Sequence, residues 1–72
     1  MAKDVKRLHV VILPDNVKKN VELEGSRVKE LVKALGMSIE EVVVVREGRP
    51  LHEDDIVEDG EELTVIRAAS GG

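Results

Sequence analysis

The sequence predicts a small α+β domain in which one mixed sheet of four or five strands packs against a single helix. Three observations predict this class: short β-branched runs bounded by turn residues, one stretch with helical periodicity, and a length of 72 residues, which accommodates one domain. A chain of this size buries only about 60% of its unfolded surface, so we expect a thin core and no deep pocket. The chain has no Cys and no aromatic residue, so that core must consist of aliphatic side chains.

The first two strands are expected to form a hairpin. Residues 8–13 are apolar and β-branched, and the turn-forming residues 14–16 close the run. Residues 17–24 follow, and this run alternates at its end, with Val21 and Leu23 on one side. Two such runs around a turn are typical of a hairpin.

One helix is expected between Gly25 and Gly36. Ser26 is the expected N-cap, and Gly36 is expected to end the helix in the left-handed conformation. Four apolar residues between them have the i, i+3, i+4, i+7 spacing of one buried stripe: Val28, Leu31, Val32 and Leu35. A helix this short is not stable alone, so it must dock on the apolar face of the sheet.

The second half of the chain supplies the remaining strands. Residues 42–45 are four consecutive valines, which favour an extended backbone, and residues 62–67 form the last strand. Residues 49–51 are expected to add a short edge strand, where a proline is tolerated. Ile56 and Val57 are expected to hold the acidic loop before them against the core. The order is therefore strand, strand, helix, strand, optional short strand, strand, which predicts the ubiquitin-like roll called a β-grasp.

Composition and charge limit the classes of partner and the cellular compartment that we expect for the protein. With 15 acidic and 11 basic residues the net charge is −4, which argues against direct binding of nucleic acid. No run approaches 18 apolar residues, and the N-terminus has no secretion signal, so we expect no membrane association and a cytoplasmic monomer. The expected division is a domain over residues 1–67 and a flexible tail over residues 68–72.

No group of residues indicates an active site or a metal site. His9 and His52 are far apart in the sequence and have no ligand or triad spacing; His9 alternates with apolar residues, as expected of an exposed strand position. The acidic residues 53–55 lack the glycine and the ligand spacing of a calcium loop. We therefore expect a carrier or substrate protein with no bound cofactor or metal, not an enzyme.

The chemical signal lies at the C-terminus. A chain ends in two glycines by chance only about 0.5% of the time, and Gly71 and Gly72 have no Cβ, so they could enter a channel too narrow for other residues. The Gly72 carboxylate is a poor electrophile, but its attack on the α-phosphate of ATP would give a mixed anhydride. A sulfur or amine nucleophile could then take the acyl group from this anhydride. An inert, frayed tail is the alternative interpretation.

The folded domain would need a docking face for the enzyme that activates the tail. Ordering five tail residues costs on the order of 5–10 kcal/mol, and contacts of the domain must offset this cost. If Val42, Val44, Leu63 and Val65 face the helix, alternation places an apolar patch on the opposite face: Val43, Val45 and Ile66. The alternative is that these three residues only satisfy β-propensity or lie inside.

Together these segments resemble the ubiquitin-like sulfur-carrier superfamily. The resemblance covers residues 8–72 and is strongest in residues 31–45, in Glu-Gly-Arg-Pro-Leu at 47–51, in residues 62–67 and in the terminal Gly-Gly. The superfamily includes the thiamine-biosynthesis sulfur carrier, the small subunit of molybdopterin synthase and the small archaeal modifier proteins. The Gly-Arg-Pro segment and the missing aromatic residues are most similar to the archaeal branch that also serves in tRNA thiolation.

The resemblance implies an activation pathway. A ubiquitin-activating-type enzyme, using ATP and magnesium, would adenylate Gly72 while Gly71 threads its channel. Sulfur transfer would then give a thiocarboxylate, or transfer to an acceptor lysine would give an isopeptide bond, so the implied partners include sulfur-donor and acceptor-lysine proteins. Val45 and Ile66 fall where the family has its apolar partner face.

Two other interpretations stay open. One is a non-catalytic β-grasp binding module with an inert tail, and the other is a dedicated small subunit of molybdopterin synthase. Residues 68–70, Ala-Ala-Ser, are plainer than the tails of many members, so the matching activating enzyme also stays open.

Overall fold

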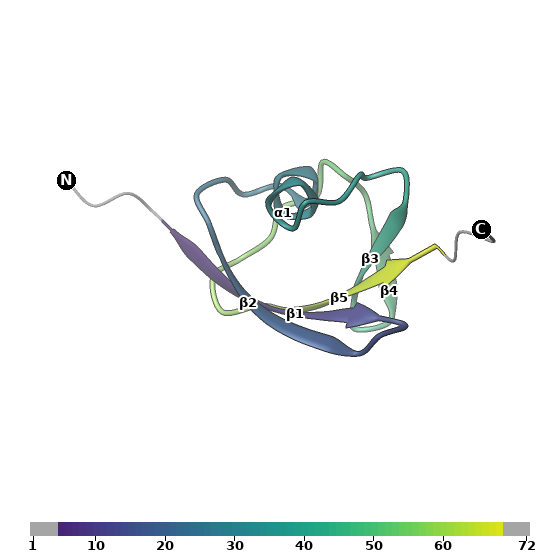
Figure 1. The fold of residues 1–72 in the computed structure, drawn as a ribbon. Coiled ribbons are helices and arrows are strands. Elements are labelled where there is room, and N and C mark those ends of the chain that lie inside the picture. Colours follow the sequence, from purple (N-terminus) through teal and green to yellow (C-terminus); the bar gives the residue numbers. More distant parts are fainter. Residues whose placement is uncertain (1–4, 69–72) are drawn as a thin grey trace.

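The computed structural model describes residues 5–68 and contains one sheet and one helix (Figure 1). The elements in chain order are β1 (Lys6–Leu13), β2 (Val17–Leu23), α1 (Val28–Ala34), β3 (Val42–Arg46), β4 (Arg49–Leu51) and β5 (Glu62–Arg67). This order is the predicted one, and the optional short strand at residues 49–51 is present as β4.

The sheet is mixed, and its last strand in sequence is its central strand in space. The strand order is β2-β1-β5-β3-β4. β5 pairs in parallel with β1 and antiparallel with β3, while β1 with β2 and β3 with β4 form antiparallel pairs. The helix α1 lies across one face of this sheet (Figure 1). The chain therefore leaves the sheet from a strand that is held on both sides.

The core lies between α1 and the inner face of the sheet and is purely aliphatic. α1 contributes its predicted stripe, with Val28, Leu31 and Val32 almost completely buried and Leu35 half-buried. The strands and the connection before β5 contribute nine further buried residues: Leu8, Val10, Ile12, Leu23, Val42, Val44, Val57, Leu63 and Val65. No polar side chain is buried among the described residues, so apolar burial drives the docking of the helix.

The helix begins one residue later than predicted, because Ser26 is not its N-cap. Arg27 is the N-cap, with extended backbone angles, and its N–H donates to the Glu30 carboxylate at 3.3 Å. The Ser26 carbonyl instead accepts the Val57 N–H at 2.8 Å. This bond takes the carbonyl that an N-cap residue would offer to the first turn of the helix. Gly36 follows the helix with φ 77°, as predicted.

Val57 is the one side chain of the connection from β4 to β5 that is buried in the core. Val57 is completely buried, but Ile56 is 48% exposed, so the expectation for Ile56 was wrong. Ile56 and Arg27 form an isolated antiparallel bridge. In extended backbone adjacent side chains point to opposite sides, so burial of Val57 turns Ile56 toward solvent.

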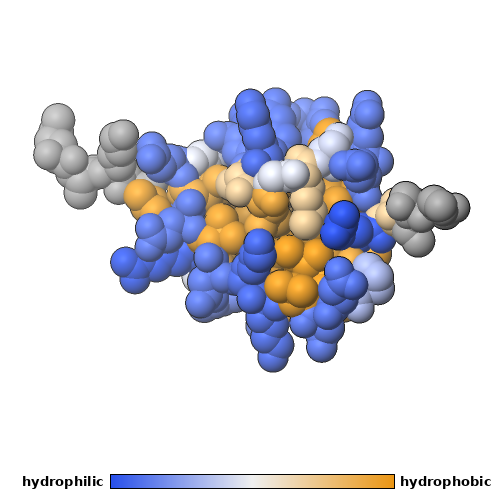
Figure 2. Space-filling view, in the orientation of Figure 1, coloured by the Kyte–Doolittle hydropathy of each residue, from blue (hydrophilic) through white to orange (hydrophobic). Residues whose placement is uncertain are grey.

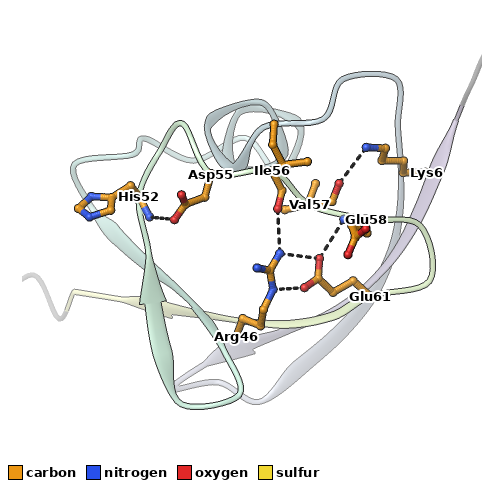
Figure 3. Close-up of polar contacts among 8 residues, drawn as sticks. All are labelled: Lys6, Arg46, His52, Asp55, Ile56, Val57, Glu58 and Glu61. Carbon is orange, nitrogen blue, oxygen red and sulfur yellow. Dashed lines mark hydrogen bonds and ion pairs between the residues drawn. The ribbon is translucent and has the colours of Figure 1, made fainter.

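An ion pair between Arg46 and Glu61, here called the clamp, fastens this connection to the sheet (Figure 3). The guanidinium donates to both carboxylate oxygens, with Nη2 at 2.9 Å from Oε1. Arg46 Nη2 also donates to the Ile56 carbonyl at 2.8 Å, and Glu61 Oε1 accepts the Glu58 N–H at 2.9 Å. Because Arg46 ends β3 and Glu61 precedes β5, the clamp joins both strands and the connection.

The clamp favours the charged form of Glu61. Burial alone would raise the pKa of Glu61, but the hydrogen bonds from Arg46 and the Glu58 N–H, together with the positive charges of Arg46 and Lys6, outweigh burial and lower the pKa. The pKa of Arg46 is raised, mainly by its hydrogen bond to Glu61. Both groups are thus held ionised in the folded state.

Replacing Glu61 is expected to lower the stability of the fold and to make that stability less dependent on pH. Since the pKa of Glu61 is lower in the folded than in the unfolded chain, its stabilisation is complete above the unfolded value of about 4.3 and is lost as pH falls through the folded value. Glu61→Gln should lower the free energy of unfolding at pH 7 by about 1–2 kcal/mol and flatten the decline of stability in acid. Urea unfolding followed by circular dichroism measures both effects.

Glu53→Gln is the matched control, because the Glu53 side chain is exposed and makes no hydrogen bond or ion pair within residues 5–68. Equal acid dependence of the unfolding free energy in the two variants would show that the clamp does not stabilise the fold.

The docking of α1 is tested at Leu31, which is completely buried. Leu31→Ala should lower the free energy of unfolding by about 2–5 kcal/mol, because the lost methyl groups leave a cavity. Lys33→Ala, on the exposed side of the same helix, should change it by no more than about 0.5 kcal/mol. Urea titrations of the two variants measure the difference, and similar losses would contradict the assignment of the buried stripe.

Candidate functional site

The candidate site is the region where the chain leaves the sheet at the end of β5. Ile66, near the end of β5, lies between Leu13 of β1 and Val43 of β3 in the registers of the two ladders. The next residue after the strand, Ala68, donates its N–H to the Glu41 carbonyl at 2.8 Å. The path of the chain is therefore fixed by hydrogen bonds up to Ala68.

The predicted reactive residues, Gly71 and Gly72, lie outside the described residues. The same holds for residues 69 and 70 of the predicted tail. What the structure contributes is the position from which these residues continue, namely the end of the central strand (Figure 1).

The predicted alternation along β3 and β5 is confirmed. Val42 and Val44 are buried, while Val43 is 48% exposed and Ile66 is 40% exposed on the sheet face away from α1. Val43 and Ile66 are partners in the β3–β5 ladder, so their side chains lie next to each other on this outer face. This exposed apolar pair thus includes Ile66, the residue before the last one of β5.

Val45, the third predicted residue of this face, is half-buried. It lies opposite Thr64 of β5 and Pro50 of β4, and Thr64 is also half-buried. The structure therefore brings all three predicted residues to the outer face, but Val43 and Ile66 present more surface than Val45.

β1 supplies a further part of this face, which is not among the residues predicted from the sequence. Val11 and Leu13 are half-buried and lie opposite Thr64 and Ile66 in the parallel β1–β5 ladder. The signal was available, because the run from Val10 to Leu13 is apolar on both faces, as is typical of an interior strand. We call Val11, Leu13, Val43, Val45 and Ile66 the outer patch.

A hollow borders the outer patch at the start of β5. Its lining includes Val45 and Thr64 from the patch side, Glu47 and Gly48 from the β3–β4 turn, and the clamp residues with Glu62. The charged groups with shifted pKa, Arg46 and Glu61, thus lie at the opposite end of β5 from the tail, where they hold the strand but do not reach its exit.

Several other polar residues are engaged in local structure. His9 is exposed, as predicted, with Nδ1 at 2.8 Å from Asn20 Oδ1. In the acidic loop, Asp55 accepts the His52 N–H at 2.7 Å and Asp54 lies 3.3 Å from Lys29 Nζ. Within residues 5–68 no group of three His, Asp or Glu is placed to hold a metal ion.

Between residues 5 and 68 there is also no helix with the length and hydrophobicity needed to cross a bilayer. The described part of the chain thus offers an apolar face and a fixed exit for its C-terminal residues. Such an arrangement can present a chain end to a partner.

Comparisons with known proteins agree with this architecture. The crystal structure of the ubiquitin-like domain of Dsk2 from Plasmodium falciparum superposes with a TM-score of 0.73 at 17% identity, covering 90% of this chain and all of that domain. This similarity establishes the ubiquitin-like β-grasp fold.

The sequence comparisons establish the family. An uncharacterized protein from Archaeoglobus fulgidus is 41% identical over 58 residues, which cover 81% of this chain and 85% of the relative. The sequence model of the family described as small archaeal modifier protein 2 matches residues 5–68, the whole of the described domain. The chain belongs to the family of small archaeal modifier protein 2, and it is a ubiquitin-like modifier.

Proposed function

We propose that this modifier is activated at the carboxylate of Gly72 by a ubiquitin-activating-type enzyme. The observation that carries the proposal is the placement of β5: it is the central strand, it is bonded on both sides, and in the sequence only residues 68–70 separate its end from Gly71 and Gly72. Membership of a modifier family supports the same function. The chain itself is the substrate of the reaction and not its catalyst.

The chemistry requires little of the chain beyond a free carboxylate. One carboxylate oxygen of Gly72 attacks the α-phosphorus of the ATP that the enzyme binds with magnesium, and pyrophosphate leaves. Hydrosulfide released by a sulfur-donor partner can then displace AMP to give a thiocarboxylate, while a lysine amine of an acceptor protein displaces AMP and loses a proton to give an isopeptide bond. Both products start from the same acyl adenylate.

The outer patch is the proposed docking face for the activating enzyme. Val43 and Ile66 form an exposed apolar pair beside the exit of the chain, so an enzyme that binds the tail also meets this face. Burial of the two side chains would contribute to offsetting the entropy lost when the tail is ordered. Exposed apolar residues grouped in this way mark partner surfaces.

Removal of Gly72 tests the site of activation. The variant without Gly72 should keep the melting temperature of the full chain, because the buried core of the described domain lies between Leu8 and Val65, but should no longer support ATP–pyrophosphate exchange by the cognate activating enzyme. A chain that lacks Ala2 loses one residue from the other end and should retain full exchange. Undiminished exchange without Gly72 would refute the proposed site.

The docking face is tested by Ile66→Asp. Because Ile66 is 40% exposed, the change should leave the melting temperature within a few degrees, while the efficiency of activation should fall at least about tenfold if Ile66 is a central anchor. Ile56→Asp is the matched control: Ile56 is similarly exposed but belongs to the β4–β5 connection, and activation should be unchanged. Equal activation of both variants would exclude the outer patch as the docking face.

A further inference from the structure

The edge strand β2 has no partner on its outer side. Its seven residues pair with β1 only, in an uninterrupted register. Among residues 5–68, no other backbone hydrogen bond involves this strand. Because β2 contains neither a proline nor a bulge, it presents a regular row of unpaired N–H and C=O groups.

The opposite edge of the sheet is protected. β4 has only three residues, and the middle one is Pro50, which lacks an N–H. The two edges therefore differ, and only β2 is suited to pair with a further strand. Figure 2 shows apolar surface on this side of the molecule, between the helix and the strands below it. Val17, at the start of β2, is 40% exposed.

The side chains of β2 complement a second copy of the same strand. Asn20 is the middle residue of β2, so two antiparallel copies that overlap completely are related by a twofold axis at Asn20. In this register Lys18 of each copy lies opposite Glu22 of the other, and both residues are exposed on the outer face. On the inner face, the exposed Val17 lies opposite Leu23.

The neighbouring register toward the N-terminus is less favourable. A twofold axis at Lys19 would place Lys19 opposite its own copy and would leave Lys18 opposite Asn20. Like charges directly opposite each other in a ladder are destabilising. Lys18 has no ion pair among the described residues, and Glu22 has one with Arg7 at 3.7 Å between largely exposed side chains. Lys18 and Glu22 are therefore available for pairing across the interface.

We propose that two copies of this chain associate through β2, antiparallel and centred on Asn20, into one continuous sheet with five strands from each copy. The helices α1 then lie on one face of the joined sheet and the two outer patches on the other. β5 and β3 are separated from the interface by β1, so the outer patches and the ends of β5 stay accessible. The association replaces the expected monomer and does not depend on the proposed activation of Gly72.

Charge reversal with rescue tests the interface. Sedimentation equilibrium of the full chain from about 10 µM to about 1 mM should show a mass that rises from 7.9 kDa toward twice that value. Lys18→Glu converts two attractive pairs into two repulsive ones and should raise the dimer dissociation constant at least about tenfold. The double variant Lys18→Glu with Glu22→Lys restores opposite charges and should recover the dimer.

Lys33→Glu is the matched control, since Lys33 carries the same charge on the exposed side of α1, and it should leave the dissociation constant unchanged. Hydrogen exchange of the β2 amides should slow as concentration rises. A chain that stays monomeric over the whole range, a dimer indifferent to Lys18→Glu, or a double variant no better than the single one would each overturn the proposal.

Discussion

The position of β5 between β1 and β3 is the constraint on which the rest of the structure depends. Its inner side chains, Leu63 and Val65, are almost completely buried against the helix side of the sheet. Its outer side chain Ile66 joins Val43 on the opposite face. Since residues on one strand alternate between two faces, the same six residues that close the core also build the exposed patch and direct the chain out of the sheet. The stability of the core and the point at which the chain leaves the sheet are therefore coupled in one strand.

Most of the fold could be predicted because its signals are local. Four consecutive valines, the stripe from Val28 to Leu35 and the turn residues each define one element without knowledge of the others. The start of the helix was wrong for a non-local reason: Ser26 is a good capping residue, but its carbonyl is taken by the N–H of Val57, thirty-one positions away in the sequence. The exposure of Ile56 has the same origin, because the bridge to Arg27 sets which neighbour turns inward.

Within the candidate site, only the residues whose exposure follows from alternation along a single strand could be predicted. Alternation placed Val43 and Ile66 outside, and the structure agrees. The contribution of Leu13 depends on the parallel pairing of the first and last strands, which strand patterns alone do not specify. The Arg46–Glu61 clamp likewise joins residues fifteen positions apart, and nothing in the sequence distinguishes these two charges from the many others. Sequence patterns thus indicate which side chains of one strand point to the same face of the sheet. The pairing of distant segments decides which residues of different strands lie together on that face.

Under the proposed function, this protein presents a reactive chain end and its partners carry out the chemistry. Mass spectrometry of the C-terminal peptide, isolated from cells that naturally produce the protein, tests this most directly. We expect the peptide to end at Gly72 and to occur either as a thiocarboxylate or joined through an isopeptide bond to a lysine of another protein. A C-terminus that is found only as an unmodified carboxylate, under conditions where the activating enzyme is present and active, would contradict the account.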